Sequence, residues 1–566
     1  KVWKGAEGLA EDVRYYGKWM RDEAEKRIGH LYPKVEITAE MAKDRPDLKP
    51  LVGKKQTVTA WIWARTVKSP NPAYGAAEVP LASTFLLATK PGKESFVSPV
   101  ISKKNYTFEV FRTKPPADAK EGTKSGRGTF RCLLSGAGIS SDYLRDEGRS
   151  GRLGQRMMAM VTVGKASRHY IAPTQDQERI ASAATPEWKP DLPLYEQALG
   201  FRVGNYGMRK WADLFSSRQL LALTTFSGLI TELRTPVLEA AVGKGSEKHK
   251  HFDSVAYADA IALYLSFAID KSAVYWNTLC PWLNQPKNEI VGNCFSRQTV
   301  QMVWDFAEAN PFSDSGGNLD KQIEYICRVL TDCLGNMPVA GTALQRNAAS
   351  AMDGHHWLIS TDPPYFDNIG YADLSEFFYA WLRPALKDCY PELLATMGTP
   401  KMEELVATPA RHGGVEEAQQ FFLSGMTTVM GFLAKQSAAT LPITIYYAFK
   451  QSDTDESDTN STGWEAFLEA VVRAGLAVHG TWPMRTERPG RMRDTGSNAL
   501  ASSIVLVCRK RSQTAETISR RQFIRELNAA LPQALDAMTR KSEGEHSPVA
   551  PVDLSQAIIG PGMAVF

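Results

Sequence analysis

The sequence predicts a mixed α/β protein, and three features of the 566-residue chain support this expectation. Strand-like and helix-like segments alternate over residues 336–510, which is typical of an α/β sheet with helices between its strands. Short strand-like runs separated by Gly, Pro and Lys clusters predict a small β domain at residues 51–190. Apolar residues at helical spacing dominate residues 1–50 and 191–335, so we expect helices there.

Each segment has its own pattern. In the first segment, four residues recur at helical spacing: Tyr15, Trp19, Ala24 and Ile28. Residues 57–63 and 106–111 predict strands in the second. Residues 256–276 are apolar over nearly their whole surface, which predicts a buried helix in the third.

Five strands are expected within 336–510, at residues 341–345, 357–360, 443–449, 477–482 and 503–507. Because open α/β sheets place their sites at the carboxyl ends of strands, we expect functional residues there. Residues 452–462 are acidic and polar and predict a loop. The last segment, 511–566, is expected to hold one helix at 520–538 and a tail.

Composition is that of an ordinary globular protein, with 43% hydrophobic and 23% charged residues. The net charge of +4 permits nucleic-acid binding but does not argue for it, so any basic surface must be local. Seven cysteines without a C-x-x-C pair predict reduced, mostly buried thiols in a cytoplasmic protein. The longest apolar stretch, at 260–269, is too short to cross a bilayer, so no membrane is expected.

The most informative motif is Asp362-Pro363-Pro364-Tyr365, which follows the apolar run 357–361. The two prolines stiffen a turn and fix where the carbonyl of Pro363 points. That carbonyl and the carboxylate of Asp362 can accept the two N–H bonds of an amino group, while Tyr365 offers an aromatic face. The alternative is a proline-rich turn that ends a buried strand.

Four segments, 9–33, 201–226, 361–379 and 481–509, resemble in register the adenine-specific DNA methylases that carry a zinc ribbon. The resemblance implies a Rossmann-like class I methyltransferase sheet with an inserted zinc-ribbon-like β domain and a helical region. It implies methyl transfer from S-adenosylmethionine to N6 of a flipped adenine in double-stranded DNA. It also implies a role in prokaryotic DNA modification or phage defence, beside helicase or ATPase partners.

The resemblance assigns contacts to S-adenosylmethionine to Phe215, Ser217, Asn347 and Asp362. For Ser216-Ser217 a helix N-cap is at least as good an interpretation, and for Asn347 a turn residue is equally good. The glycine-rich turn of such enzymes is not found in this sequence. In the resembled family it precedes the segment that begins here, so residues 1–50 are expected to continue from a cofactor-binding part.

The zinc-ribbon ligands are largely replaced. The resemblance aligns the first cysteine pair with Ser69 and Tyr74, and the second with Cys132 and Ser135. One thiolate cannot hold a structural zinc, so we expect no metal. The core of the β domain must then come from apolar residues such as Trp61, Trp63, Phe108 and Phe130. We expect His30 and His169 to be ordinary histidines.

For DNA, the residues after the motif that could line a target-base pocket are Phe366, Asn368 and Tyr371, with core packing as the alternative for Tyr371. Four arginines are expected to contact phosphates: Arg485, Arg488, Arg491 and Arg493. Basic loops also occur at 103–104, 120–131, 149–156 and 244–250, where a solvated surface is slightly favoured.

Three other functions stay open. Cytosine-N4 methylation uses the same motif chemistry, and an aspartate in first position favours adenine only weakly. A DNA-binding or scaffold subunit without catalysis would explain the missing glycine-rich turn. Methylation of RNA or of a protein glutamine is the third, although glutamine methylases usually carry Asn where this chain has Asp362.

Overall fold

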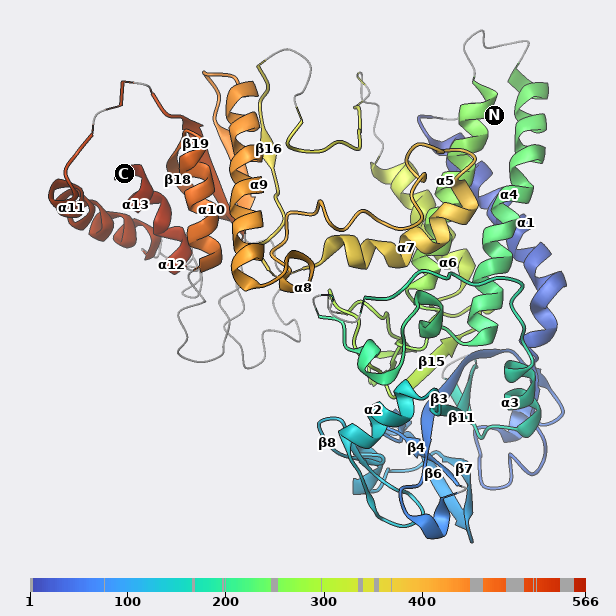
Figure 1. Cartoon of the computed structure of the whole chain (residues 1–566). Coiled ribbons are helices and arrows are strands. Elements are labelled where there is room, and N and C mark those ends of the chain that lie inside the picture. The colour runs from blue at the N-terminus through green and yellow to red at the C-terminus, as the bar shows by residue number, and fades with distance from the viewer. Residues whose placement is uncertain are drawn as a thin grey trace. The chain divides into compact units, whose positions relative to one another are not determined.

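The chain folds into two compact units in the computed structural model (Figure 1). Unit 1 comprises residues 1–341 and 372–399, and unit 2 comprises residues 342–371 and 400–566. The structure describes residues 4–75, 77–164, 168–195, 198, 200–245, 253–296, 298–333, 339, 341–350, 356–367, 369–447, 462–484, 503–512, 514–515, 517–539 and 554–565. The expected mixed α/β class is confirmed at this level.

Strand β3 (Val58–Lys68) is the centre of the main sheet of unit 1. One edge pairs with β11 (Gly154–Val163), which pairs in turn with β12 (Arg168–Ile171). The other edge pairs with β15 (Asp305–Ala309) and β4 (Glu78–Leu81), and every pairing is antiparallel. Ten of the eleven residues of β3 are buried, including the polar Thr59, Arg65 and Thr66, so both faces of this strand are covered.

Two small antiparallel sheets lie in the predicted β domain. One contains β5 (Leu86–Ala88), β6 (Ser95–Ser102) and β7 (Asn105–Phe111). The other contains β8 (Lys124–Gly126), β9 (Thr129–Arg131) and β10 (Gly138–Ile139), followed by helix α2 (Ser141–Arg149). The four aromatic residues expected to form the core are all buried: Trp61, Trp63, Phe108 and Phe130.

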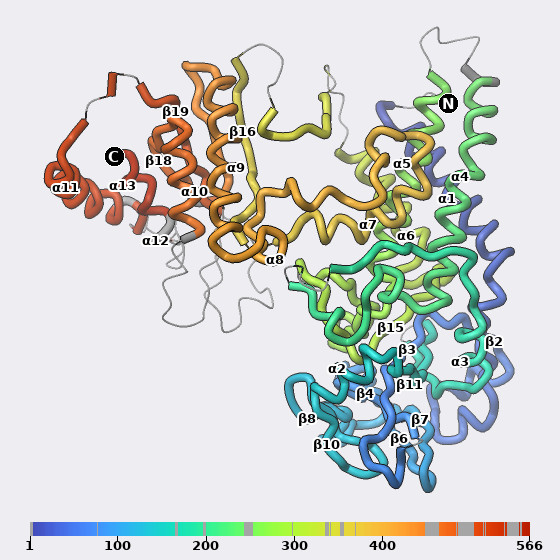
Figure 2. Tube along the Cα trace, in the orientation of Figure 1, coloured from blue at the N-terminus to red at the C-terminus, as the bar shows by residue number. Residues whose placement is uncertain are grey.

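Helices form much of the rest of unit 1. The long ones are α1 (Glu7–Ile28), α4 (Ser217–Gly245) and α5 (Ser254–Ala273), which contact one another and α6 (Leu319–Arg328). Figure 2 shows α1 beside α4 although more than 180 residues separate them in the chain. Helix α7 (Tyr371–Leu386), apart from its first residue, also belongs to unit 1 rather than to the sheet of unit 2.

Smaller elements complete this unit: β1 (Val35–Glu36), β2 (Lys55–Gln56), α3 (Gln175–Ser182), β13 (Trp282–Gln285), β14 (Asn288–Val291), the 3-10 helices η1 (Gly29–Leu31), η2 (Lys49–Leu51), η3 (Pro72–Tyr74), η4 (Ala117–Lys120), η5 (Val203–Tyr206) and η6 (Trp211–Leu214), and the π-helix η7 (Val329–Cys333). The region expected to be helical, 191–335, holds α4, α5 and α6 but also the strands β13, β14 and β15. Strand β15 has the sequence DFAEA, in which charged residues hide the strand pattern. Glu308 is nonetheless buried, because Arg218 and Trp63 bond to it.

Unit 2 contains a four-stranded sheet in the order β16 (Ser360–Thr361), β17 (Ile443–Tyr447), β19 (Ser503–Lys510) and β18 (Leu476–Met484). Strands β16 and β17 are parallel, and β19 is antiparallel to both of its neighbours. Helices α9 (Val415–Gln436) and α10 (Thr462–Arg473) contact each other and share the hydrophobic core of this sheet. The other helices are α8 (Pro409–His412), α11 (Arg520–Thr539), α12 (Leu554–Ala557) and α13 (Ile559–Val565).

Three of the five expected strands of this region are found as β17, β18 and β19, and the one expected at 357–360 is present only as the two-residue β16 (Ser360–Thr361). The fifth, at residues 341–345, is wrong, because these residues are exposed and form no regular structure. Without a neighbouring strand, an apolar run this short has nothing to pair with. Within the described residues, no helix is long and apolar enough to cross a membrane. All seven cysteines are free, and four of them are buried.

Candidate functional site

The motif Asp362–Tyr365 lies at the carboxyl end of β16, as expected. The N–H of Thr444 in β17 donates to the carbonyl of Ile359 at 3.0 Å, which holds the chain parallel to β17 up to the motif. The ladder ends at Thr361. Pro363 and Pro364 have no N–H to donate, so the strand cannot continue through them.

The motif exposes its carboxylate and buries its first proline. Asp362 is exposed, Pro363 is buried, and Pro364 and Tyr365 are half-buried. Partial burial raises the pKa of the Asp362 carboxyl above its ordinary value. The carboxylate oxygens are therefore open to a ligand that brings hydrogen-bond donors.

Tyr447, the last residue of β17, contacts the motif and the residue that follows it. Its hydroxyl oxygen accepts the backbone N–H of Phe366 at 3.3 Å, and its ring meets the ring of Tyr365 edge-on at 5.4 Å. The Tyr447 ring is fully buried and stacks on Phe467 at 4.0 Å. Burial raises the pKa of Tyr447, so its hydroxyl stays protonated. The turn after β16 is thus fixed against a rigid neighbouring strand.

Phe366 lies in the core instead of lining an open pocket. It is 8% exposed and packs edge-on against Phe422 of α9 at 5.1 Å. Its carbonyl accepts the N–H of Ala407 at 2.7 Å. Most of the Phe366 ring is therefore inaccessible to a target base, contrary to our expectation. Asn368, expected beside it, lies outside the described residues.

Tyr371 is the residue of this group that faces solvent, at 41% exposure, so it is not the core residue of the alternative interpretation. Burial of part of the ring and the nearby groups Tyr365, Asp362 and Glu404 raise the pKa of Tyr371 to about 12. Three residues of the expected site, Asp362, Tyr365 and Tyr371, are therefore close enough to interact electrostatically.

A buried ion pair near the motif was missed. Arg411 and Glu404 lie 3.3 Å apart, with side chains 4% and 12% exposed. They flank Ala407, whose N–H bonds to Phe366. Two charges seven residues apart in an irregular segment follow no strand or helix periodicity, so no sequence pattern predicts this pair.

Of the two cofactor contacts expected in unit 1, Phe215 is buried and Ser217 is exposed. Phe215 is 7% exposed and packs against Phe377 and Trp381 of α7 at 5.8 and 5.3 Å. Ser217 is the exposed first residue of α4. The helix-cap interpretation is confirmed, with Ser216 as the cap. Its hydroxyl accepts the N–H of Gln219 at 3.2 Å, and its own N–H donates to the Gln219 side chain at 2.9 Å.

Asn347 is a turn residue, which confirms the second alternative. Its side-chain oxygen accepts the N–H of Ala349 at 2.8 Å, and its carbonyl accepts the N–H of Ser350 at 2.9 Å. The side chain of Asn347 is thus occupied by its own turn.

The positions aligned with zinc ligands are partly brought together. The hydroxyl of Ser69 lies 3.2 Å from the sulfur of Cys132. Burial alone would raise the pKa of the Cys132 thiol, but hydrogen bonds from Ser135 and Ser69 lower it overall. Searched over the described residues, the chain has no group of three His, Cys, Asp or Glu that could hold a metal.

The two histidines have ordinary environments. His169 lies 3.1 Å from a carboxylate oxygen of Asp47, which also bonds to Arg45 at 2.9 Å. Burial alone would raise the pKa of Asp47, but these partners hold it well below its usual range. His30 lies in η1 at the end of α1.

The four arginines expected to contact DNA phosphates, Arg485, Arg488, Arg491 and Arg493, lie outside the described residues. The comparisons with known proteins add no further assignment: no family model, curated protein or solved structure matches the chain.

Proposed function

We propose that this chain carries the amine-activating site of an S-adenosylmethionine-dependent DNA methyltransferase that modifies N6 of adenine. The observation that carries the proposal is Asp362-Pro363-Pro364-Tyr365 at the carboxyl end of a strand, with an exposed carboxylate and a turn fixed by Tyr447. Sites of open α/β sheets lie at such strand ends.

The chemistry needs two acceptors. The lone pair of an exocyclic amine is delocalised into the base, so the nitrogen is a poor nucleophile. If Asp362 accepts one N–H and the carbonyl of Pro363 accepts the other, electron density returns to nitrogen as the methyl group arrives from the sulfonium of the donor. Positioning and electrostatics then supply the rate increase, and no covalent enzyme intermediate is needed.

The aromatic residues suit a base taken out of the duplex. Tyr365 is half-buried and held edge-on by Tyr447, while Tyr371 is exposed and lies within electrostatic reach of Asp362. Stacking on an aromatic ring contributes roughly 1–3 kcal/mol per base. We propose that Tyr365 and Tyr371 hold the base, with Phe366 supporting the turn from the core.

The Rossmann-like class I methyltransferase fold is part of the same proposal. In support, β16 and β17 are parallel, and β18 runs in their direction because β19 is antiparallel to both β17 and β18. Helix α9 precedes β17 and α10 joins β17 to β18, which is the alternation that a crossover-connected sheet requires.

The test is methyl transfer from labelled S-adenosylmethionine to genomic DNA by the complete encoded protein, with Asp362→Asn as the variant. Removing one preorganised partner of the reacting group should lower kcat by about 10² or more. Asp367→Asn, which removes an exposed carboxylate five residues along the same loop, is the matched control and should keep its activity.

Digestion of the product DNA to nucleosides identifies the base: N6-methyladenosine supports the proposal, and N4-methylcytosine changes the target. Calorimetry with S-adenosylmethionine tests whether the complete protein binds the methyl donor. If the complete protein neither binds the donor nor transfers methyl groups, the catalytic proposal fails and a DNA-binding or scaffold subunit becomes the better account.

A further inference from the structure

Positive charge is concentrated in one short stretch of unit 1. Residues 90–131 hold ten lysines and arginines against four aspartates and glutamates, a net charge of +6. The whole chain has a net charge of only +4, so the remaining residues together carry −2. The small net charge of the protein therefore conceals a local basic region.

Most cations of this stretch face solvent without a carboxylate partner. Eight are exposed and form no ion pair with any described residue: Lys90, Lys103, Lys104, Lys114, Lys120, Lys124, Arg127 and Arg131. Arg112 is different, because it pairs with Asp47 at 3.1 Å. Exposed cations without a carboxylate partner are screened by ions from solution and add no ion-pair stabilisation to the fold.

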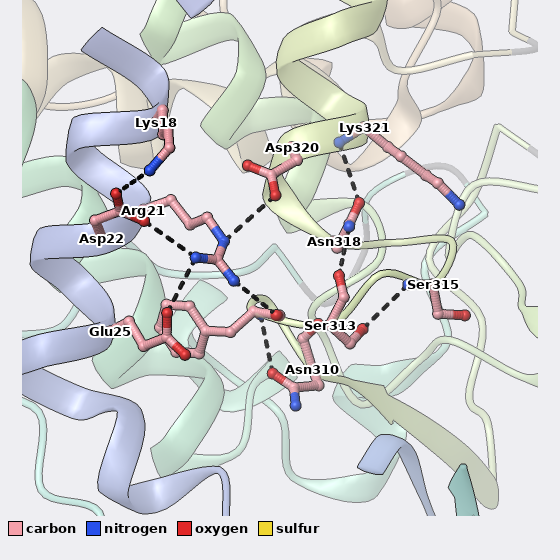
Figure 3. Close-up of polar contacts among 11 residues, drawn as sticks. Lys18, Arg21, Asp22, Glu25, Asn310, Ser313, Ser315, Asn318, Asp320 and Lys321 are labelled. Atoms are coloured by element: carbon pink, nitrogen blue, oxygen red, sulfur yellow. Dashed lines mark hydrogen bonds and ion pairs between the residues drawn. The ribbon is translucent and has the colours of Figure 1, made fainter. Parts of the chain in front are cut away.

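Several cations elsewhere in unit 1 are neutralised by carboxylates. Figure 3 shows Arg21 of α1 between Asp22, Glu25 and Asp320, at 3.1, 3.0 and 3.3 Å, with Lys18 directed at Asp22. Within α2 and its C-terminal turn, Arg145 pairs with Asp142 and Arg152 pairs with Glu147. Other exposed lysines of unit 1, among them Lys34, Lys43 and Lys49, also form no ion pair with a described residue, so residues 90–131 differ from them by their net charge of +6.

The backbone presents these cations on two hairpins. In the first, β8 and β9 carry Lys124 and Arg131, and Arg127 lies in the turn between them next to Gly128 with φ of 74°. In the second, Lys103 lies in the two-residue turn between β6 and β7 with φ of 53°. It is the one non-glycine residue with positive φ among those described, in a position that normally favours glycine.

We propose that these two basic hairpins, one with Lys103 and Lys104 and the other with Lys124, Arg127 and Arg131, bind the phosphate backbone of double-stranded DNA. Evenly exposed cations without carboxylate partners match a polyanion. The β8–β9 hairpin exposes no large apolar side chain, which favours phosphate contact there over base stacking or insertion into lipid, whereas the β6–β7 hairpin also exposes Val100, Ile101 and Phe111. The proposal rests on the proposed function only in naming DNA as the polyanion.

The experiment is fluorescence anisotropy of a labelled duplex with the 566-residue chain, over a range of salt concentrations and without methyl donor. The triple variant Lys124→Gln, Arg127→Gln, Arg131→Gln should weaken binding by about 10²–10³ near 0.1 M salt. It should also reduce the slope of log affinity against log salt by about 2.7.

The matched control removes three cations that have carboxylate partners: Lys18→Gln, Lys26→Gln and Arg179→Gln. It changes the net charge equally and should bind DNA like the parent chain. Lys103→Gly is a second variant, which should weaken binding while keeping or raising the thermal midpoint, because glycine suits the positive φ. If Lys103 had only a structural role, DNA binding would not fall while the thermal midpoint is kept or raised.

Three results would overturn the proposal: no binding of the duplex by the parent chain at low salt, an equal loss in the triple variant and its control, or binding to anionic phosphatidylserine vesicles in place of DNA. The exposed Val100 and Ile101 beside Lys103 make the vesicle arm a fair test. Asp362→Asn should bind DNA normally, so failure of methyl transfer and failure of docking are distinguishable.

Discussion

Removing the hydroxyl of Tyr447 tests whether this side chain positions the motif. The Tyr447→Phe variant keeps the ring that stacks on Phe467 at 4.0 Å and meets Tyr365 at 5.4 Å. It removes only the oxygen that accepts the N–H of Phe366 at 3.3 Å. The turn after β16 then loses its polar link to β17, while the core keeps its shape.

The magnitude follows from the geometry of this bond. A buried donor without a partner costs roughly 1–3 kcal/mol, and a neutral bond as long as this one belongs at the lower end, about 1 kcal/mol. We expect the free energy of unfolding of unit 2 to fall by about that amount. If the same cost opposes correct placement of Asp362 in the transition state, kcat should fall by about fivefold.

The assay is steady-state methyl transfer beside urea unfolding. A positioning role predicts a lower kcat with an unchanged KM for DNA. The control is Tyr446→Phe, one residue earlier on the opposite face of β17, which should leave both quantities unchanged. The reasoning is refuted if Tyr447→Phe retains the parent kcat in a preparation where Asp362→Asn is inactive.

Two further predictions concern unit 1. Asp270 in α5 is 8% exposed, has a carboxylate oxygen without a hydrogen-bond partner, and burial raises its pKa well above the ordinary value. The folded protein therefore favours the neutral carboxyl. The free energy of unfolding includes this contribution at low pH and loses it as pH rises through the raised pKa of Asp270. Asp270→Asn should remove this loss, so thermal midpoints of the variant and the parent should diverge with rising pH, and parallel curves would contradict the assignment. In the second, Arg218→Met should cost about 3–5 kcal/mol because it leaves Glu308 buried and unpaired, whereas Arg218→Met with Glu308→Leu should recover a large part of that cost. Equal urea midpoints for the single and double variants would show that the pair is not coupled.

The sequence predicted local features of the site well. Proline chemistry places the end of β16 at the motif, and the apolar runs around 443, 477 and 503 all form strands of one sheet. These are properties of short segments, so periodicity and propensity suffice. The capping box at Ser216 belongs to the same class, because Ser216 and Gln219 are three residues apart.

Features that depend on distant segments could not be predicted. Tyr447 supports Phe366 from 81 residues away, and Glu308 becomes a buried strand residue because Arg218 reaches it across 90 residues. The expected strand at 341–345 shows the opposite error, in which a local pattern finds no partner. Tertiary context can therefore create a strand that local propensity does not predict, and can also leave a predicted strand unformed.

DNA docking and amine activation are proposed for different compact units of the chain. Cations that contact phosphates bind the ground state and the transition state alike, so the triple lysine and arginine variant should raise KM for DNA and leave kcat unchanged. Asp362 acts on the amine as the methyl group arrives, so its replacement should lower kcat and leave DNA affinity unchanged. A combined variant should show the product of the two effects, because the substitutions share no described contact. A loss of kcat in the cation variant would instead mean that docking also aligns the target base, and the functions of the two units would then be coupled.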